Sequence, residues 1–285
     1  MSSQITQMFI SEMPGGRSLL SAGRHLFLSN SQISEKRELS YGSRKRQKLD
    51  IYEPVEIDED TETVVFIHGG GWETGNKDVH KFIGRSWAQK NFTVAIPNYR
   101  LAPDATYPDQ VEDIAAAVSW LQHNYDNFTG SLYLAGHSAG AHLASLFGFS
   151  DHWRKIAELE LERIRGFILL AGVYQFYPFE IADPRVRRFL GEKSYWEEAQ
   201  PFNHLKKSLP PVFLAHGQED GEVSPEQSIQ LKERLAQINV SSELLLEGHV
   251  GHLELLLRTT MINGNFWSSM DKFFDDRTTD NSQVA

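Results

Sequence analysis

The chain has 285 residues, of which 40% are hydrophobic and none is cysteine, and its formal net charge is -10. The lack of cysteine excludes disulfides, a thiolate nucleophile and cysteine-ligated metal sites. The negative charge argues against nucleic acid or an anionic membrane surface as a partner. A chain of this length and composition can bury one large core, so we expect residues 1–285 to form a single α/β domain.

The N-terminal region predicts little regular structure at first. Residues 1–36 have only short apolar stretches and predict an irregular or partly helical arm, with neither a signal peptide nor a membrane span evident, so we expect a cytoplasmic protein. Alternation from Leu39 to Tyr52 predicts a hairpin of edge strands. We interpret the basic run Arg44-Lys45-Arg46 as the solvated face of an edge strand rather than as a localisation signal.

A regular alternation of strand-like and helical patterns follows. The predicted strands are Val64 to Ile67, Phe92 to Ile96, Leu132 to Ala135, Gly166 to Leu170, Pro211 to Ala215 and Glu243 to Leu246. The clearest predicted helices run from Pro108 to His123 and from Pro225 to Ile238. This alternation predicts a mostly parallel central sheet with helices on both faces.

The first predicted parallel strand leads directly into the run His68-Gly69-Gly70-Gly71-Trp72. Successive glycines let backbone N–H groups approach a ligand closely, as an oxyanion hole requires. A flexible loop is the alternative, but the position straight after a buried strand favours the functional interpretation. We therefore expect Gly70 and Gly71 to stabilise an oxyanion, and His68 to brace their loop by hydrogen bonding.

A second motif follows the strand that ends at Ala135. Gly136-His137-Ser138-Ala139-Gly140 has the form G-x-S-x-G and precedes a run of small and apolar residues. This pattern is typical of a sharp strand-to-helix turn that exposes the serine oxygen, so Ser138 is the predicted nucleophile and Ala139 a third oxyanion donor. We expect His137 and His142 to be packing or supporting residues.

Residues 175–210 are too long for an ordinary connection between two predicted strands. They are rich in aromatic residues, namely Phe176, Tyr177, Phe179, Phe189, Tyr195, Trp196 and Phe202. We predict a cap or lid over the pocket; the alternative is a helical insertion at the periphery.

A serine nucleophile needs a histidine base and an orienting carboxylate, which in this kind of fold follow it in the order acid, then histidine. The loop after Ala215 holds Glu219, Asp220 and Glu222. We choose Asp220, because a short side chain followed by Gly221 suits a tight turn, and we expect the two glutamates to face water.

Two histidines, His249 and His252, follow the last predicted strand. We favour His252 as the base because Gly251 before it and the leucines after it describe a tight loop that enters a helix; His249 is the alternative. The resulting Ser-His-Asp set predicts acyl transfer to a small-molecule substrate and requires no metal or organic cofactor.

With these motifs the chain resembles the α/β-hydrolase superfamily, in particular the branch with an HGGGW-type oxyanion loop, which is similar to hormone-sensitive-lipase-like carboxylesterases. The likeness covers residues 38–275 approximately. The runs Leu49 to Tyr52, Gly136 to Ala144 and His252 to Glu254, with Trp72, Gly75 and Lys77, look like arylformamidases (kynurenine formamidases) and small bacterial carboxylesterases.

This resemblance implies Ser138, Asp220 and His252 as the catalytic triad. The segment Asn98 to Pro103 and the pair Tyr107-Pro108 look more like general esterases than animal formamidases. We therefore predict a carboxylesterase first and an arylformamidase second. A non-catalytic receptor that keeps the fold is the remaining alternative, which a complete triad argues against.

Overall fold

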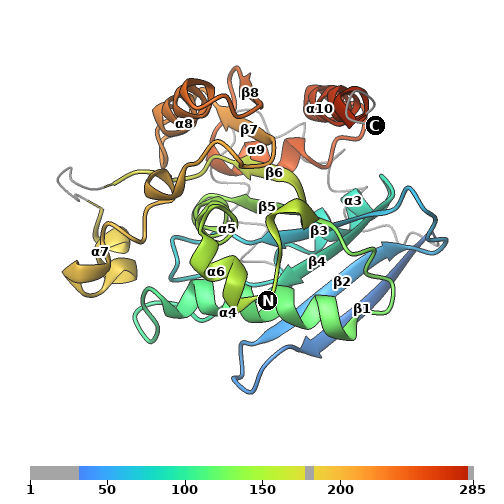
Figure 1. Cartoon of the computed structure of the whole chain (residues 1–285). Coiled ribbons are helices and arrows are strands. Elements are labelled where there is room, and N and C mark those ends of the chain that lie inside the picture. The colour runs from blue at the N-terminus through green and yellow to red at the C-terminus, as the bar shows by residue number, and fades with distance from the viewer. Residues whose placement is uncertain (1–31, 177–182, 282–285) are drawn as a thin grey trace.

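An eight-stranded sheet forms the centre of the computed structural model, which describes residues 32–176 and 183–281 (Figure 1). The strand order is β1-β2-β4-β3-β5-β6-β7-β8. The strands are β1 Ile33–Ser40, β2 Lys48–Pro54, β3 Glu62–Ile67, β4 Phe92–Pro97, β5 Leu132–His137, β6 Ile164–Leu170, β7 Val212–Gly217 and β8 Ser242–Glu247. β2 pairs antiparallel with β1 and β4, and all other pairings are parallel, which confirms the predicted α/β class.

Helices cover both faces of this sheet. The longer helices are α3 Lys81–Ala88, α4 Asp109–Asn124, α5 Ala139–Phe149, α8 Glu226–Gln237 and α10 Asn265–Asn281, and the shorter ones are α6 Asp151–Ile156, α7 Pro184–Leu190 and α9 His252–Arg258. One apolar cluster contains side chains of α4, α5, α6 and α8, and the other contains side chains of α3, α9 and α10. Among the described residues, no helix is long and apolar enough to span a bilayer.

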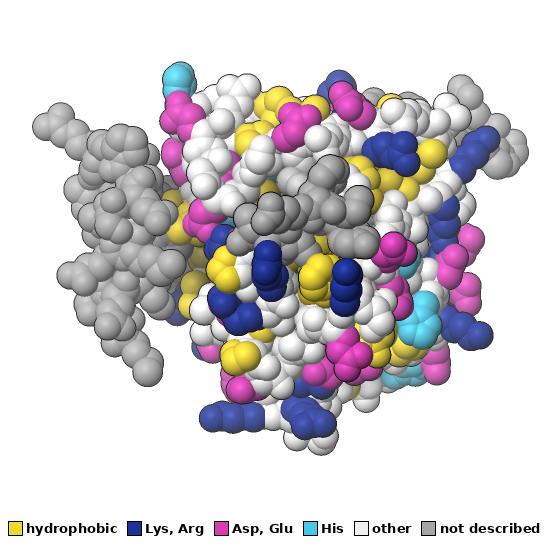
Figure 2. Space-filling model, turned by 90° about the vertical axis from the view of Figure 1, so that its left-hand side faces the viewer, with side chains coloured by type: hydrophobic (Ala, Val, Ile, Leu, Met, Phe, Trp, Pro, Cys, Tyr) yellow, Lys and Arg dark blue, Asp and Glu magenta, His cyan; other side chains and the backbone are white. Residues whose placement is uncertain are grey.

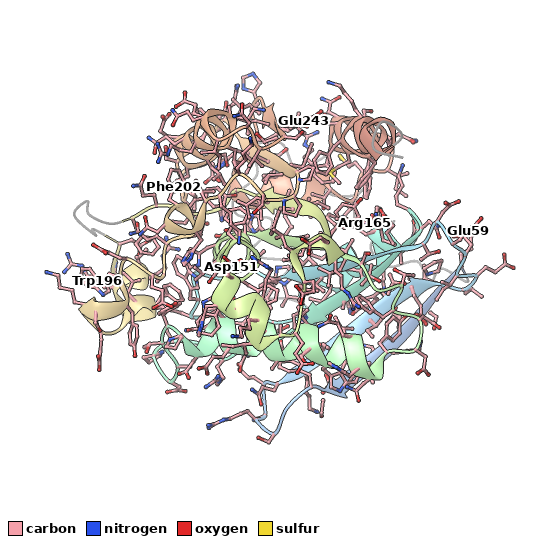
Figure 3. The ribbon with its side chains drawn as sticks, in the orientation of Figure 1. Glu59, Asp151, Arg165, Trp196, Phe202 and Glu243 are labelled. Atoms are coloured by element: carbon pink, nitrogen blue, oxygen red, sulfur yellow. The ribbon has the colours of Figure 1, made fainter. Side chains whose placement is uncertain are left out.

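The apolar runs chosen from the sequence lie within strands of the parallel part of the sheet, except that Pro211 directly precedes β7. Their residues are apolar on both sides because helices cover both faces. Glu59 in the turn before β3 and Arg165 at the start of β6 lie on one side of the molecule, whereas Trp196 and Phe202 of the 175–210 segment lie toward the opposite side (Figure 3). The loops that follow β3, β5, β7 and β8 therefore leave the sheet at one edge, the place where parallel α/β sheets bind their ligands.

The first strand begins earlier than the sequence predicted. Residues 33–36, assigned above to the N-terminal arm, belong to β1, which pairs with β2 from Ile33 opposite Pro54. The strand was missed because it is an edge strand whose charged side chains form ion pairs instead of an apolar face: Lys36 Nζ lies 2.6 Å from Glu53 Oε1. Residues 1–31 of the predicted arm lie outside the described residues.

The basic run does not lie on a strand face as predicted, and one of its residues, Arg46, is not fully solvated. Residues 44–46 form the turn between β1 and β2 rather than a strand face, and Arg46 is half-buried. Its Nε donates to the carbonyl of Tyr99 at 2.7 Å and its Nη2 to that of Gly75 at 2.9 Å. Burial lowers the pKa of this guanidinium, and the two carbonyls satisfy its donors.

Candidate active site

Ser138 lies at the tip of a sharp turn between β5 and α5. Its backbone has φ 56° and ψ -124°, a left-handed conformation that is strained for a residue with a side chain. Its N–H donates to the carbonyl of Leu170 at 2.8 Å. A Cβ on Gly140 would lie 2.0 Å from the carbonyl oxygen of Ile67, and one on Gly136 would lie 2.4 Å from that of Gly140. The turn therefore needs both glycines of the G-x-S-x-G motif.

The glycine-rich loop after β3 also has left-handed backbone. Gly70 and Gly71 have φ values of 124° and 59°, and Trp72 has φ 61°. The carbonyl of Gly70 accepts hydrogen bonds from the N–H groups of Glu73 and Thr74 at 3.1 and 2.9 Å. Among the described residues, no carbonyl accepts a backbone hydrogen bond from the N–H groups of Gly70, Gly71 or Ala139. These three N–H groups are therefore free to bind an anion.

Hydrogen bonds fix the beginning of this loop. His68 Nδ1 donates to the carbonyl of Gly69 at 2.8 Å, as predicted for a bracing residue. The hydroxyl of Tyr99 donates to the carbonyl of His68 at 3.0 Å. Burial lowers the pKa of His68 well below its usual range, so the ring stays neutral and keeps this arrangement.

The far end of the same loop is tied to the sheet through Lys77. Its side chain is buried, and its Nζ lies 3.0 Å from Oδ1 of the buried Asp50 on β2. Its backbone N–H donates to Asn98 Oδ1 at 2.7 Å. A buried ion pair of this kind fixes geometry, because breaking it would leave an uncompensated buried charge.

His142 connects the oxyanion loop to the 175–210 segment. Trp72 Nε1 donates to His142 Nδ1 at 3.2 Å, and His142 Nε2 donates to the carbonyl of Ala199 at 2.8 Å. Burial lowers the pKa of His142 to about 4, which keeps the ring in this neutral tautomer. The supporting role expected for His142 is thus confirmed, and the indole that it holds stacks on Phe189 with ring centroids 4.7 Å apart.

Asp220 and His252 come together from the loops after β7 and β8. His252 Nδ1 donates to Asp220 Oδ2 at 2.6 Å, and the imidazole is only 7% exposed. Asp220 Oδ1 accepts from the backbone N–H groups of Glu222 and Val223, both at 2.9 Å. Burial would raise the pKa of Asp220, but hydrogen bonds from His216 and His252 outweigh it and hold the pKa well below its usual range. The carboxylate is therefore ionised and fixed in orientation.

The alternative histidine and the two glutamates lie apart from the contact between Asp220 and His252. His249 has a side chain that is 94% exposed, and its Nδ1 lies 2.7 Å from Oε1 of the exposed Glu219. Glu222 faces Arg185, with Nη1 and Oε2 3.4 Å apart. The structure thus separates a solvated pair, His249 and Glu219, from the buried pair, His252 and Asp220.

His137 places His252 beside the turn that carries Ser138. Its Nε2 donates to the carbonyl of His252 at 3.0 Å, and the two imidazole rings have centroids 4.5 Å apart. Burial lowers the pKa of His137 well below its usual range, so this ring is a neutral spacer rather than a second base. Because His137 directly precedes Ser138, this contact ties the loop that carries His252 to the turn between β5 and α5.

A pocket of about 310 Å³ opens at Ser138. Gly71 and Ala139 line it together with the serine, whereas Gly70 is not among its lining residues. Trp72, Val173, Phe176 and Val186 give it an apolar wall, and Asp183, Arg185 and Glu222 supply charged groups. Figure 2 views the molecule from the side that carries α7, where acidic, basic and apolar side chains are interspersed.

The 175–210 segment supplies one wall of this pocket, through Gln175, Phe176, Asp183, Arg185 and Val186. Of the aromatic residues noted in the sequence, Phe176 lines the pocket and Phe189 is fully buried behind Trp72. Tyr177 and Phe179 lie outside the described residues. That the segment moves as a lid stays a prediction.

Sequence reasoning gave no role to His216, the last residue but one of β7. This buried imidazole places Nε2 3.2 Å from Asp220 Oδ2. The spacing His216 to Asp220 was the available signal, because a tight turn after a strand brings residues four apart together. Within residues 32–176 and 183–281, no group of three or more His, Asp or Glu residues could hold a metal ion.

Comparisons with known proteins found relatives that are named as esterases and as kynurenine formamidases. Isoprenylcysteine alpha-carbonyl methylesterase of Arabidopsis thaliana is 29% identical over 272 residues, covering 85% of this chain and 60% of the relative. Kynurenine formamidase of Danio rerio is 33% identical over 141 residues, covering 50% of this chain and 47% of the relative. The chain thus spans about 60% of the length of the methylesterase that it matches.

The fold has solved counterparts. Esterase B from Lactobacillus Rhamnosis superposes with a TM-score of 0.74 at 21% identity, covering 99% of this chain and 96% of that one. This likeness confirms the α/β-hydrolase fold that the motifs predicted. The BD-FAE family model matches residues 49–235, well over half of the chain. The chain therefore belongs to the BD-FAE family.

Proposed function

We propose that this protein is a serine hydrolase that cleaves small carboxylic esters through an acyl-enzyme. Ser138 is the nucleophile, His252 the general base and Asp220 the orienting acid. The observation that carries the proposal is the 2.6 Å hydrogen bond from His252 to Asp220, made beside the turn that presents Ser138 to the pocket. Relatives named as a methylesterase and as esterases support the ester over other acyl substrates.

The reaction follows from these positions. His252 takes the hydroxyl proton of Ser138 as the serine attacks the ester carbonyl carbon. The N–H groups of Gly70, Gly71 and Ala139 stabilise the oxyanion, and loss of one such donor costs about 3 to 4 kcal/mol of transition-state stabilisation. His252 then protonates the departing alcohol, and water attacks the acyl-enzyme by the same route to release the acid.

The triad is tested by hydrolysis of p-nitrophenyl acetate. We expect Ser138→Ala to lose activity by several orders of magnitude, since the nucleophile is removed. Ser145→Ala is the matched control: this buried serine of α5 donates only to carbonyls of its own helix, Ala141 and His142, at 2.8 and 3.0 Å. An inert wild-type protein, or a Ser138→Ala variant as active as the wild type, would refute the proposal.

The choice of base has its own test. His252→Gln should abolish turnover, because the buried partner of Asp220 is lost, whereas His249→Gln should retain it, because His249 is solvated and paired with Glu219. Equal activity of the wild type and His252→Gln would assign the base elsewhere. Activity lost only in His249→Gln would favour the alternative histidine.

An arylformamidase activity is the second candidate. It uses the same triad, and the matched kynurenine formamidase and the aromatic wall of Trp72 and Phe176 favour it. The test compares kcat/KM for N-formylkynurenine with kcat/KM for short acyl esters. An ester preference of several orders of magnitude would eliminate the formamidase, and the opposite preference would replace the esterase proposal.

We further propose that the enzyme acts in the cytoplasm on a small-molecule ester or formamide, without nucleic acid, a membrane, a metal or an organic cofactor. The formal net charge of -10 supports the exclusion of anionic partners. Apart from the attacking water, the reaction described above needs no group beyond the side chains and backbone of this chain.

A further inference from the structure

The proposed acid is held by more donors than a triad requires. Asp220 Oδ1 accepts from two backbone N–H groups of its own loop. Asp220 Oδ2 lies 2.6 Å from His252 Nδ1 and 3.2 Å from His216 Nε2. The carboxylate has no exposed surface, so these four donors take the place of its hydration. One carboxylate oxygen is thus shared by two imidazoles.

The surroundings of His216 fix which of its nitrogens carries a proton. Nε2 faces two acceptors, Asp220 Oδ2 at 3.2 Å and the carbonyl of Val223 at 3.0 Å, so it must be the donor. Nδ1 lies 2.7 Å from Oγ of the buried Ser228 on α8, whose hydroxyl can donate to it. His216 is itself fully buried, and every polar atom of its ring has a partner. The ring cannot turn without breaking these bonds.

Resting on the proposed triad, we propose that His216 is a positioning residue for the reaction: its Nε2–H holds Asp220 and draws part of the carboxylate's negative charge away from His252. A carboxylate that interacts with a single imidazole stabilises the imidazolium form of that ring more strongly than a carboxylate shared by two imidazoles. Sharing Asp220 therefore weakens the attraction between the carboxylate and the imidazolium form of His252, which must pass its proton on to the leaving alcohol.

Other ionisable groups around this pair are accounted for. His137 on β5 packs on His252 and is kept neutral by burial. Glu219 and His249 pair with each other at the surface, and Glu222 pairs with Arg185 of α7. Among the described residues, His216 and His252 are the two side chains whose ring nitrogens lie within 3.2 Å of Asp220 Oδ2.

The test is the pH profile of kcat/KM for p-nitrophenyl acetate. We expect His216→Leu to lower kcat about tenfold with little change in KM, because Asp220 is no longer held in place from the side of His216. We also expect the acid limb of the profile to move upward by about half a pH unit, because Asp220 then acts on His252 alone. His216→Gln keeps an N–H donor of similar reach and should restore the position of the limb. A folded His216→Leu variant whose acid limb stays in place would show that His216 only fills space.

Ser228→Ala provides a second route should His216→Leu fail to fold. It removes the partner of Nδ1 and leaves both histidines, so we expect a smaller shift in the same direction. In both variants, the NMR resonance of the proton between His252 Nδ1 and Asp220 Oδ2 should move downfield as that bond strengthens. An unmoved resonance and an unmoved limb in folded Ser228→Ala would overturn the role of His216.

The result is separable from that of the triad itself. If His252→Gln or Ser138→Ala keeps full activity, the proposed function fails. The role of His216 then fails with it, because that role depends on the triad. If both are inactive while the acid limb is the same in the wild type and in His216→Leu, the triad stands and the role of His216 is refuted.

Discussion

At the scale of single residues, the turn that carries Ser138 leaves no room for side chains at Gly136 and Gly140. The backbone of Gly140 lies against that of Ile67, and the backbone of Gly136 lies against that of Gly140. These contacts join β5, α5 and the end of β3, so the residue that carries the nucleophile is positioned by backbone packing rather than by its own side chain.

We expect Gly140→Ala to destabilise the protein by at least about 2 kcal/mol, because a methyl group 2.0 Å from the Ile67 carbonyl forces the strand and helix apart. Gly221→Ala is the control: among the described residues, no heavy atom lies within 4 Å of the methyl position, and we expect a change within about 0.5 kcal/mol. Urea denaturation measures both. Equal stability of the two variants would contradict the packing argument.

The site residues differ in how far the sequence could predict them. Ser138, Asp220 and His252 could be predicted because each follows a strand that the sequence also predicts, and the structure brings Asp220 and His252 into contact. His216 was missed because its significance lies in the 3.2 Å to Asp220 Oδ2 and in Ser228 of a distant helix. Such partners depend on how α8 packs, which local patterns do not encode.

At the scale of elements, α7 supports the oxyanion loop from outside the sheet. Phe189 of α7 is fully buried, and its ring stacks on Trp72 at 4.7 Å and meets the His142 ring edge-on at 5.0 Å. Trp72 keeps its left-handed backbone while held by these contacts. The position of the oxyanion loop therefore depends on the 175–210 segment.

We expect Phe189→Ala to cost about 3 to 5 kcal/mol of stability if α7 unfolds together with the core, and to lower kcat because Trp72 loses its support. Phe189→Leu, which keeps most of the volume, should cost less than about 1.5 kcal/mol and retain most of the activity. Denaturation and kcat measured on the same samples test this link. Full activity in Phe189→Ala would show that the loop holds its shape alone.

The strands could be predicted from the sequence where helices cover both faces of the sheet. Strands β3 to β8 carry apolar runs because helices cover both faces, and α4 shows its buried Val111, Ile114, Val118 and Leu121 on one side. The start of β1 and the placing of Arg46 could not be read in this way. Charged side chains hold both in place, through ion pairs at β1 and through backbone carbonyls at Arg46. A hydrophobicity pattern predicts that such side chains face solvent.

At the scale of the whole molecule, the fold buries several neutral imidazoles. Burial lowers the pKa values of His68, His80, His137 and His142. In the unfolded chain these rings take up protons near pH 6.5, while in the folded protein they do not. The unfolded state therefore gains protons as the pH falls, and folding stability declines with it.

The histidine contribution to stability is fully present above pH 6.5 and is lost as the pH falls toward the folded values. For His142, whose pKa is lowered from 6.5 to about 4, this loss amounts to about 3 kcal/mol between those two pH values. Urea denaturation from pH 7 to pH 4 measures it. In His142→Asn the decline should be shallower by that amount, and in His123→Gln, an exposed control, it should match the wild type.

Carboxylates act at lower pH. Hydrogen bonds from Lys48 and Lys77 lower the pKa of Glu38 to about 2, so its contribution is present above pH 4.5 and is lost between pH 4.5 and 2. Acid unfolding should therefore begin with the histidines. If the free energy of unfolding fell equally steeply with pH in His142→Asn and in the wild type, this order would be contradicted.

The charged residues of β1 have a consequence beyond the stability of one molecule. An edge strand with free N–H and C=O groups is a template on which a strand of another molecule can pair. On β1, Glu35 bonds Arg85 at 2.6 Å, and Lys36 and Arg37 bond acids of β2. An incoming strand would have to pack its side chains against this row of fixed charges, so the outermost strand of the sheet resists the intermolecular growth that an apolar edge would invite.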